Sequence, residues 1–239
     1  MKLLLTPILL SGEAGGAAPG KSSFFTELGR QFSQSFIEED RYMNILVGLK
    51  NTLIITFFAV LLGVVLGTIV ALVKVGHGNN PSKLRVANAV CTLYLTVIRG
   101  TPVVVQLMIM YYVILSQTRV SDITAAVLAF GINSGAYVAE VIRSGIQSVD
   151  RGQMEAGRSL GLSLRTTMVK IVFPQALKNV LPAIGNEFIA LLKETSVAGY
   201  IGIQDLTKGG DIIRSRTYLA FTPLLMTAAV YLLIVIGLS

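Results

Sequence analysis

Charged residues are scarce in this chain. They account for 14% of its 239 residues, whereas apolar residues account for 53%. A soluble domain carries about 25% charged residues, so this composition excludes an ordinary soluble protein. The mean hydropathy of +0.69 agrees with that conclusion. We therefore expect an all-α polytopic membrane protein.

Cysteine and histidine are each present only once. Cys91 lies in an apolar run, so a disulfide or a thiolate metal site is excluded. His77 lies in a short stretch rich in Gly and Asn, where we expect a loop with a solvated side chain. The sequence also contains no paired-carboxylate motif that could carry out catalysis in place of cysteine or histidine. The sequence therefore predicts no catalytic residue, no metal site and no cofactor, and it disfavours a membrane enzyme.

The net charge of +7 raises the question of a nucleic-acid partner. The sequence has neither an Arg-rich motif nor clustered aromatic residues on which bases would stack. In a membrane protein, basic residues instead mark the loops that stay in the cytoplasm. We therefore predict a lipid bilayer, and no nucleic acid, around this chain.

Residues 1–43 are predicted to form an N-terminal tail. The stretch GGAAPGKS, from Gly15 to Ser22, matches the phosphate-loop pattern G-x-x-x-x-G-K-[ST]. A nucleotide-binding domain needs about 100 soluble residues or more, and the first apolar span begins near residue 51. We therefore interpret the match as part of a flexible Gly- and Ala-rich tail. After it, residues 24–40 are predicted to form an amphipathic surface helix, because apolar side chains recur there at helical intervals: Phe24, Phe25, Leu28, Phe32 and Phe36.

Five apolar spans are expected, at about residues 51–73, 86–117, 123–139, 181–203 and 217–239. About 20 helical residues suffice to cross ~30 Å of hydrocarbon. In the first span, Gly63 and Gly67 predict close approach to another helix. The fourth span is the weakest, because it contains Glu187, Lys193 and Glu194. No basic tail follows the last span, so we expect a shortened C-terminus.

A polar break interrupts the second span. It reads Arg99-Gly100-Thr101-Pro102. An arginine in hydrocarbon costs at least about 2.5 kcal/mol unless it meets water, a carboxylate or backbone carbonyls. Proline suits the first turn of a helix, where its missing N–H has no partner to lose. We therefore predict a helix junction at these four residues, with a new helix starting at Pro102.

Polar residues in the third span fall on one helix face. Asn133, Tyr137, Glu140 and Ser144 are spaced at i, i+4, i+7 and i+11. Ionisable residues inside a membrane usually face a cavity or one another. We therefore expect this face to lie toward the centre of the protein.

The stretch EAGRSLGLSLRTTMVKIVFP, at residues 155–174, is polar and basic between two apolar regions. It predicts a helix–turn–helix loop at a membrane surface. In its spacing, Glu155-Ala156-Gly157, Gly161 and Ile171-x-Phe173-Pro174 resemble the EAA loop of permease subunits of binding-protein-dependent ABC importers. Gly157 replaces the second Ala of that pattern, and Phe173 replaces the usual Leu.

Two further runs resemble the polar-amino-acid branch of these permeases. They are RGTPVVVQ, which begins at Arg99, and NSGAYVAEVIRSGIQSV, which begins at Asn133. The branch usually has an acidic residue three positions before the arginine, whereas this chain has Thr96 there. The resemblance covers about residues 45–239 and implies a permease domain at residues 44–239.

The resemblance implies an orientation and a set of partners. The N-terminus would lie outside and the C-terminus inside, with a cytoplasmic EAA loop between the third and fourth of about five helices. ATP and Mg²⁺ would be bound by separate ABC ATPase subunits. A second permease copy or a paralogue would complete the pathway, and an extracellular or periplasmic binding protein would deliver the substrate at the bacterial inner membrane. The residues implied in ATPase coupling are Glu155, Ala156, Gly157, Leu160, Gly161, Ile171 and Pro174.

The distribution of basic residues agrees with this orientation. The expected cytoplasmic loops hold nine of them: Lys74, Lys83, Arg85, Arg143, Arg151, Arg158, Arg165, Lys170 and Lys178. The two short outer loops hold four: Arg119, Lys208, Arg214 and Arg216. The cytoplasmic loops thus hold more basic residues than the outer loops, as the positive-inside rule predicts. Five basic residues between the N-terminus and Lys50 weaken this difference.

The implied substrate is a polar or basic amino acid, which is a zwitterion. Its ammonium group needs a carboxylate, and its carboxylate needs a cation or hydroxyl donors. Glu140 and Glu194 are candidates for the ammonium, Asn133 and Tyr137 for orientation, and the candidates for the carboxylate are Lys193, Thr195 and Ser196. Alternatively, Lys193 pairs with Glu140 or Glu194 and locks the third and fourth helices together.

The functional prediction is a permease subunit that translocates amino acids while a separate subunit hydrolyses ATP. The alternative is a secondary transporter or channel that has no ATPase partner. The identity of the amino acid and the choice between a homodimer and a heterodimer stay open.

Overall fold

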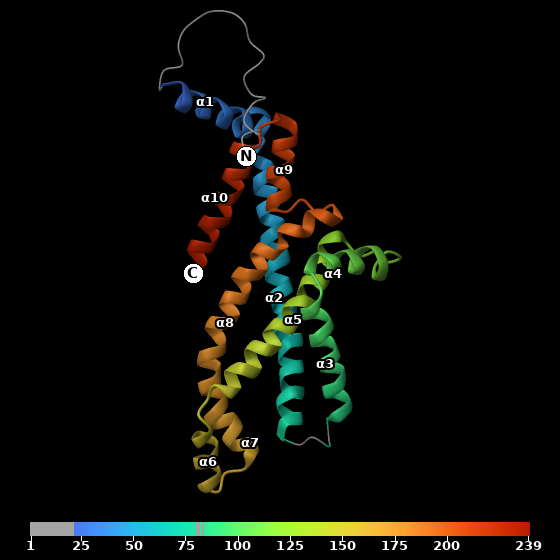
Figure 1. The fold of residues 1–239 in the computed structure, drawn as a ribbon, viewed down its shortest axis with the longest axis vertical. Coiled ribbons are helices and arrows are strands. Elements are labelled where there is room, and N and C mark those ends of the chain that lie inside the picture. The colour runs from blue at the N-terminus through green and yellow to red at the C-terminus, as the bar shows by residue number, and fades with distance from the viewer. Residues whose placement is uncertain (1–21, 80–81, 83) are drawn as a thin grey trace, which may run out of the picture.

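The computed structural model describes residues 22–79, 82 and 84–239 (Figure 1). Nearly all of the phosphate-loop match, Gly15–Lys21, and the rest of residues 1–21 lie outside the described residues. Within the described part, every regular element is a helix, which confirms the all-α prediction. The arrangement is elongated, with α1 and α9 near one end and α6 and α7 at the other (Figure 1).

Helices α2 (Tyr42–Asn79) and α5 (Asp122–Gln147) pack along each other at the centre of the fold. Gly63 and Gly67 make the close approach possible. A Cβ atom on Gly63 would lie 2.8 Å from Ser134 Oγ, and one on Gly67 would lie 2.8 Å from the Ala139 amide nitrogen. The prediction of close helix contact at this glycine pair is therefore confirmed. With 38 residues, α2 is about 57 Å long and extends beyond a ~30 Å hydrocarbon core.

The second predicted span is broken at the expected place. Helix α3 (Arg85–Gly100) ends at Thr101 and Pro102, whose backbones are extended, and α4 (Val103–Ile109) begins directly after them. A π-helical segment, η3 (Met110–Ile114), continues α4. The two halves are bent by 110° relative to each other, so this span is broken rather than straight. Pro102 is the residue before the new helix, one position from the predicted start.

The predicted helix–turn–helix at residues 155–174 is present. Helix α6 (Arg151–Ser159) is followed by α7 (Leu164–Thr167), the π-helical η4 (Met168–Val172) and α8 (Phe173–Glu194). The fourth span was predicted at residues 181–203, and these bounds are wrong. Pro174 lies in the first turn of α8, where its missing N–H is tolerated, so the helix begins well before residue 181. It ends at Glu194, and a 3₁₀ helix, η5 (Thr195–Ile201), follows.

The short polar outer loop that was predicted to hold Lys208, Arg214 and Arg216 is also wrong, because this segment is a helix. Helix α9 (Leu206–Thr217) is capped by Asp205, whose side chain accepts a hydrogen bond from the Lys208 amide. Leu206 and Ile213 are fully buried and pack with Phe36 and Ile45. The charged residues of α9 therefore occupy one side of a helix whose other side is in the core. After it, α10 (Phe221–Leu238) ends the chain.

The predicted amphipathic segment at residues 24–40 is helical but not continuous. It comprises α1 (Ser22–Phe32), the π-helical η1 (Ser33–Ile37) and the 3₁₀ turn η2 (Glu38–Asp40). Glu39 and Asp40 have φ values of 54° and 51°, so the chain turns sharply there before α2 begins. Phe36 is buried against α9, and this end of the segment therefore belongs to the core.

In the part of the chain that the structure describes, three helices are long and apolar enough to cross a membrane: α2, α5 and α10. The bent pair α3 and α4–η3 raises the number to four if it is one span. Helix α8 has 22 residues, but Lys178, Glu187, Lys193 and Glu194 lower its hydropathy. The structure thus confirms a multi-pass helical chain, and the charged α8 accounts for the difference from the predicted five spans.

Candidate functional site

The α6–α7 hairpin is assembled by two side-chain caps and one glycine contact. Asp150 accepts a hydrogen bond from the Gly152 amide at the start of α6, and Ser163 accepts one from the Thr166 amide at the start of α7. A Cβ atom on Gly157 would lie 2.5 Å from Thr167 Cγ2, so only glycine lets the two segments pack this closely. The caps hold the ends of the hairpin and the glycine sets its spacing.

The turn of the hairpin projects from the molecule. Gly161 has φ +81°, a conformation that L side chains rarely adopt, and its surroundings are open within 4 Å. Leu160 beside it is 80% exposed, and Glu155 is exposed on α6. The cap of α6 is Asp150, so Glu155 does not serve as that cap. The hairpin therefore presents an acidic and an apolar side chain on an unpartnered surface at one end of the fold (Figure 1).

The other coupling candidates occupy different positions. Ala156 and Pro174 are exposed, and Gly157 is buried against Thr167. Ile171 is half-buried, and its Cδ1 atom lies close to the Gly157 position. The predicted set therefore divides into residues that hold the hairpin together and residues at its surface.

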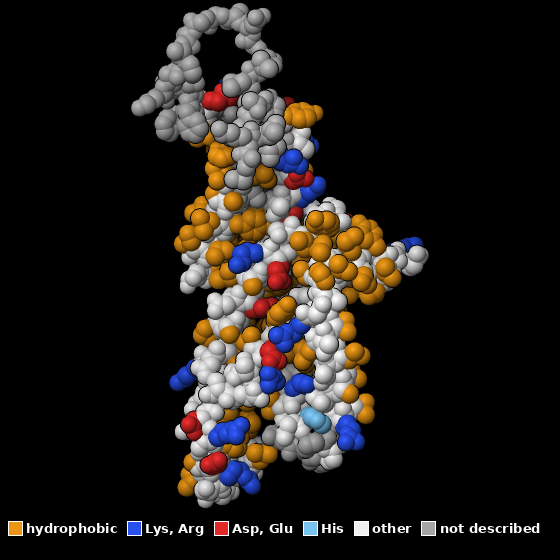
Figure 2. All heavy atoms as spheres, in the orientation of Figure 1, with side chains coloured by type: hydrophobic (Ala, Val, Ile, Leu, Met, Phe, Trp, Pro, Cys, Tyr) orange, Lys and Arg blue, Asp and Glu red, His pale blue; other side chains and the backbone are white. Residues whose placement is uncertain are grey.

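A strip of charged side chains runs along the middle of one face, between apolar margins (Figure 2). We call Glu187 and Glu194 of α8, together with Arg99 at the helix junction, the charged strip. Glu187 accepts a 2.8 Å hydrogen bond from Ser134 of α5, and Glu194, half-buried, interacts electrostatically with Glu187 and Lys193. Among the described residues, the Glu194 carboxylate has no hydrogen-bond or ion-pair partner. It is therefore the acidic group of α8 that is free to bind a ligand.

Further charges, outside the charged strip, lie on α5 and near the end of α2. The Arg99 guanidinium lies over the Tyr137 ring, 5.8 Å from its centroid. Glu140 pairs with Arg143 one turn away and interacts electrostatically with Arg99 and Lys74. Glu140 is thus engaged by a cation of its own helix, whereas Arg99 is exposed at the junction.

The alternative in which Lys193 locks two helices together is not observed. Lys193 is exposed, and within the described part of the chain it forms no ion pair within 4 Å. The third and fourth predicted spans, now α5 and α8, are instead joined by the Ser134–Glu187 hydrogen bond. Sequence spacing suggested that Lys193 pairs with Glu140 or Glu194, but its side chain takes no part in the contact between α5 and α8.

Two predicted pathway residues have partners within the fold. Thr195 is fully buried, and its hydroxyl donates to the Leu192 carbonyl, so it is not free for a ligand. Asn133 is 2% exposed and donates a 2.9 Å hydrogen bond to Gln106 of α4. Gln106 in turn donates to the Ile98 carbonyl and to Thr101, which fixes the helix junction against α5.

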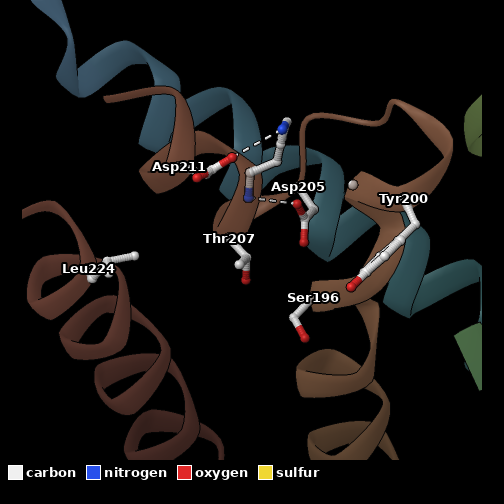
Figure 3. Close-up of a pocket in the computed structure, with 8 residues that line it drawn as sticks. Ser196, Tyr200, Asp205, Thr207, Asp211 and Leu224 are labelled. Carbon is white, nitrogen blue, oxygen red and sulfur yellow. Dashed lines mark hydrogen bonds and ion pairs between the residues drawn. The ribbon is translucent and has the colours of Figure 1, made fainter. Parts of the chain in front are cut away.

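A cavity of about 400 Å³ lies between η5, α9 and the start of α10. Ser196, Tyr200, Asp205 and Thr207 surround it (Figure 3). Asp205 is fully buried, and one of its carboxylate oxygens, Oδ2, has no partner among the described residues. Burial raises the pKa of Asp205 to about 6. Ser196, predicted to bind a substrate carboxylate, thus lines a cavity that also has the carboxylates of Asp205 and Asp211 and the ammonium group of Lys208 in its wall.

His77 does not lie in a solvated loop as predicted. It is part of the last turn of α2, is half-buried and lines a cavity of about 710 Å³ with Lys74, Arg143 and Arg151. Helix α2 continues through the Gly- and Asn-containing stretch, which local composition had marked as a loop. This cavity lies at the same end of the molecule as the α6–α7 hairpin.

Comparison with known proteins identifies the family. Residues 63–239 match the model of the binding-protein-dependent transport system inner membrane component. The chain belongs to this family of permeases. The match includes the α6–α7 hairpin, the charged strip and the helix junction to which Gln106 donates.

Permeases with assigned names are similar over most of their length. The arginine transport system permease protein ArtQ of Bacillus subtilis is 37% identical over 82% of this chain and 87% of its own. The glutamine transport system permease protein GlnP of Escherichia coli is 36% identical over 80% of this chain and 86% of its own. The similarity to members of this permease family thus extends well beyond the hairpin motif.

Two solved structures have the same fold. The crystal structure of an amino acid ABC transporter with histidines has a chain that is 43% identical, with a TM-score of 0.77, over 85% of this chain and 93% of that one. A chain of the MetNI methionine ABC transporter in an inward-facing conformation is 20% identical, with a TM-score of 0.68, over 84% and 94%. The second comparison bears on the fold alone.

Sequence analysis of this permease did not single out Gln106. It noted Glu187 only as a charge in the fourth span and assigned it no role. Gln106 follows the junction motif by four residues, but its partner Asn133 is distant in the sequence. The pairing of Glu140 with Arg143 had a local signal, because oppositely charged residues at i and i+3 meet on a helix surface.

Proposed function

We propose that this chain is the membrane-spanning permease subunit of an importer for polar amino acids, driven by ATP hydrolysis in a separate ABC ATPase. The observation that carries the proposal is the projecting α6–α7 hairpin in a chain of this family. The names of the relatives, which include arginine and glutamine permeases, support the substrate class. Together they favour an ATP-driven importer over a secondary transporter or channel.

The hairpin would be the contact with the ATPase. Leu160 offers an exposed apolar side chain at its tip, and Glu155 offers a charge that suits basic groups. The Gly157–Thr167 contact makes the hairpin a compact unit that can be pushed as a whole. The α8 helix continues directly from it through η4, so a displacement of the hairpin would be transmitted to the charged residues of α8.

The charged strip would be this subunit's half of the pathway. Its free carboxylate, Glu194, suits the ammonium group of an amino acid, since such charge-assisted hydrogen bonds are strong. The exposed Arg99 above Tyr137 suits the carboxylate. Glu140 is less suited to the ammonium than Glu194, because Arg143 already occupies it. A second copy or a paralogue would close the strip from the other side.

The proposed orientation places the α6–α7 hairpin in the cytoplasm and α9 outside, in a bacterial inner membrane. The basic residues near the hairpin support this orientation through the positive-inside rule. An external binding protein would deliver the substrate, and the family description supports this part of the proposal.

The test is to purify the tagged chain from its native membrane in mild detergent and to identify its partners by mass spectrometry. We expect a stoichiometric ABC ATPase. A related permease in equal amount would indicate a heterodimer, and its absence would indicate a homodimer. A preparation that still transports an amino acid but contains no ATPase would overturn the proposal in favour of a secondary transporter or channel.

A further inference from the structure

Two cavities adjoin at the end of the molecule where α2 and α5 finish. The first, of about 710 Å³, is the basic cavity lined by Lys74, His77, Arg143 and Arg151. The second, of about 500 Å³, is an apolar groove between α2, α5 and the η4–α8 segment. The two cavities share three lining residues, Val75, Ile146 and Met168, so they lie side by side.

The basic cavity carries more positive than negative charge. Lys74, Arg143 and Arg151 line it, and its single carboxylate, Glu140, is paired with Arg143. His77 adds a buried ring nitrogen, Nδ1, that has no hydrogen-bond partner in the described structure. These groups can together bind an anion with several oxygen atoms, such as a phosphate.

The groove has the dimensions of a single lipid chain in one leaflet. Along α2 it extends from Val64 to Val75, which is about 16 Å at 1.5 Å per residue. That length is about half of a ~30 Å hydrocarbon core. Its walls include Leu72 and Leu181, which are 60% and 57% exposed although both are apolar. An apolar chain of one leaflet's length would cover them.

We propose that these adjoining cavities bind an anionic phospholipid. Its phosphate lies among Lys74, Arg143, Arg151 and His77, and one acyl chain lies in the groove. Basic pockets between membrane helices on the cytoplasmic side are suited to anionic headgroups. The assignment to the inner leaflet rests on the orientation given with the proposed function.

Charge complementarity favours a lipid over a helix of a second copy. An apolar membrane helix would fill the groove but would leave the cations at its end without a counter-ion. An anionic lipid can occupy both cavities at once. Its headgroup would lie in the basic cavity and its acyl chain in the adjoining apolar groove. Lys74 directly follows the uncharged run at residues 51–73 and so lies at the boundary between the two cavities.

The test uses the full chain with any ATPase that copurifies. After delipidation in detergent, it is titrated with dioleoylphosphatidylglycerol and, separately, with dioleoylphosphatidylcholine, and bound lipid is counted by native mass spectrometry. We expect one phosphatidylglycerol per chain to bind about tenfold more tightly than phosphatidylcholine, whose acyl chains are the same. Equal binding of the two lipids would overturn the proposal.

Two variants locate the site. The double variant Lys74→Gln with Arg151→Gln removes two headgroup contacts, and we expect it to lose most of the preference for phosphatidylglycerol. The matched control, Arg85→Gln with Lys178→Gln, removes two exposed charges that do not line the cavity. If both double variants lose the preference equally, the attraction is a general surface effect and the proposed site is wrong.

A third variant tests the groove. Leu177→Trp places a larger side chain on its wall, and we expect loss of the bound lipid without a change in the number of chains per complex. If the lipid count stays the same and the chain instead dissociates from a second copy, the groove belongs to the dimer interface and the lipid proposal fails.

Copurification of the ATPase is measured in the same samples, so that the lipid site and the proposed importer function are tested separately. A natural chain that retains its ATPase but shows no preference for phosphatidylglycerol contradicts only the lipid site. A natural chain that prefers phosphatidylglycerol but brings no ATPase contradicts only the importer.

Discussion

Asn133 in α5 donates a hydrogen bond of 2.9 Å to Gln106 in α4, and this contact ties the helix junction to the centre of the fold. The same glutamine donates to Thr101 and to the Ile98 carbonyl, on the near side of the junction. Two helices that are bent by 110° are thereby held by one side chain. The junction places Arg99 at the edge of the charged strip.

The first prediction concerns this contact. In a double-mutant cycle with Gln106→Ala and Asn133→Ala, we expect a coupling energy of about 1 kcal/mol, because the bond joins neutral groups in a part-buried setting. The measurement is denaturant unfolding in detergent micelles, followed by circular dichroism. The exposed Gln117→Ala provides a control that should change stability by less than about 0.5 kcal/mol. Additive single effects would show that the two side chains act independently.

The second prediction concerns the hairpin turn. Gly161→Ala should destabilise the hairpin by about 1 kcal/mol, because alanine disfavours φ +81°. Asn tolerates that conformation better, and the space around Gly161 is open in the single chain, so Gly161→Asn should fold almost normally. If the turn touches an ATPase, Gly161→Asn should still lower uptake per ATP hydrolysed.

The measurement for this series is uptake and ATP hydrolysis in proteoliposomes that contain the chain and its ATPase. Insertion is checked by the amount of purified chain. Normal coupling in Gly161→Asn would argue against contact between the turn and the ATPase, whatever Gly161→Ala does.

The third prediction separates two carboxylates that look alike in the sequence. Glu194→Gln should raise the amino acid concentration at half-maximal uptake about tenfold, because it removes a charge-assisted contact to the ammonium group. Glu38→Gln, at an exposed position in η2 just before α2, is the charge-matched control. An unchanged uptake curve for Glu194→Gln would remove this residue from the pathway.

The fourth prediction is the counterpart at Glu140. Its partner Arg143 lies one turn away and both side chains are about one-third exposed, so Glu140→Gln should cost at most about 1 kcal/mol of stability. The concentration at half-maximal uptake should stay the same. A large rise in that concentration would show that Glu140, rather than Glu194, contacts the substrate.

The residues that the sequence predicted well are those with local causes. The break at Arg99–Pro102 follows from a charge and a proline within four residues, and the close helix contact at Gly63 and Gly67 follows from their spacing. The turn at Gly161 was likewise visible as a glycine in a polar stretch between helices. In each case the signal lies in a few residues that are close together in the sequence.

The features that the sequence missed depend on distant contacts. Helix α9 was mistaken for a polar connection because its charges hide a buried face, and that face is recognisable only once Leu206 and Ile213 meet Phe36. Gln106 gave no local signal, since its partner is on another helix. Which of two similar glutamates is free depends on whether a cation lies beside it, as Arg143 does beside Glu140.

The last prediction concerns Asp205, the buried cap of α9. Its pKa is raised by burial to about 6, above the ordinary value of 3.8. The folded state therefore binds the proton more tightly than the unfolded state, and the stability of this region should fall as pH rises from about 4 to about 7. Asp211 is held charged in this window, because the hydrogen bonds from Arg214 and Lys208 lower its pKa.

Hydrogen exchange at the Gly209 amide can measure this effect, because that amide donates to the Asp205 carbonyl at the first turn of α9. Protection factors, corrected for the intrinsic pH dependence of exchange, should decrease between pH 5 and about pH 7 in the natural chain. Asp205→Asn keeps an oxygen for the cap but cannot titrate, so its protection should be flat over the same range. A slope that persists in Asp205→Asn would therefore mean that the buried carboxylate is not the group that titrates.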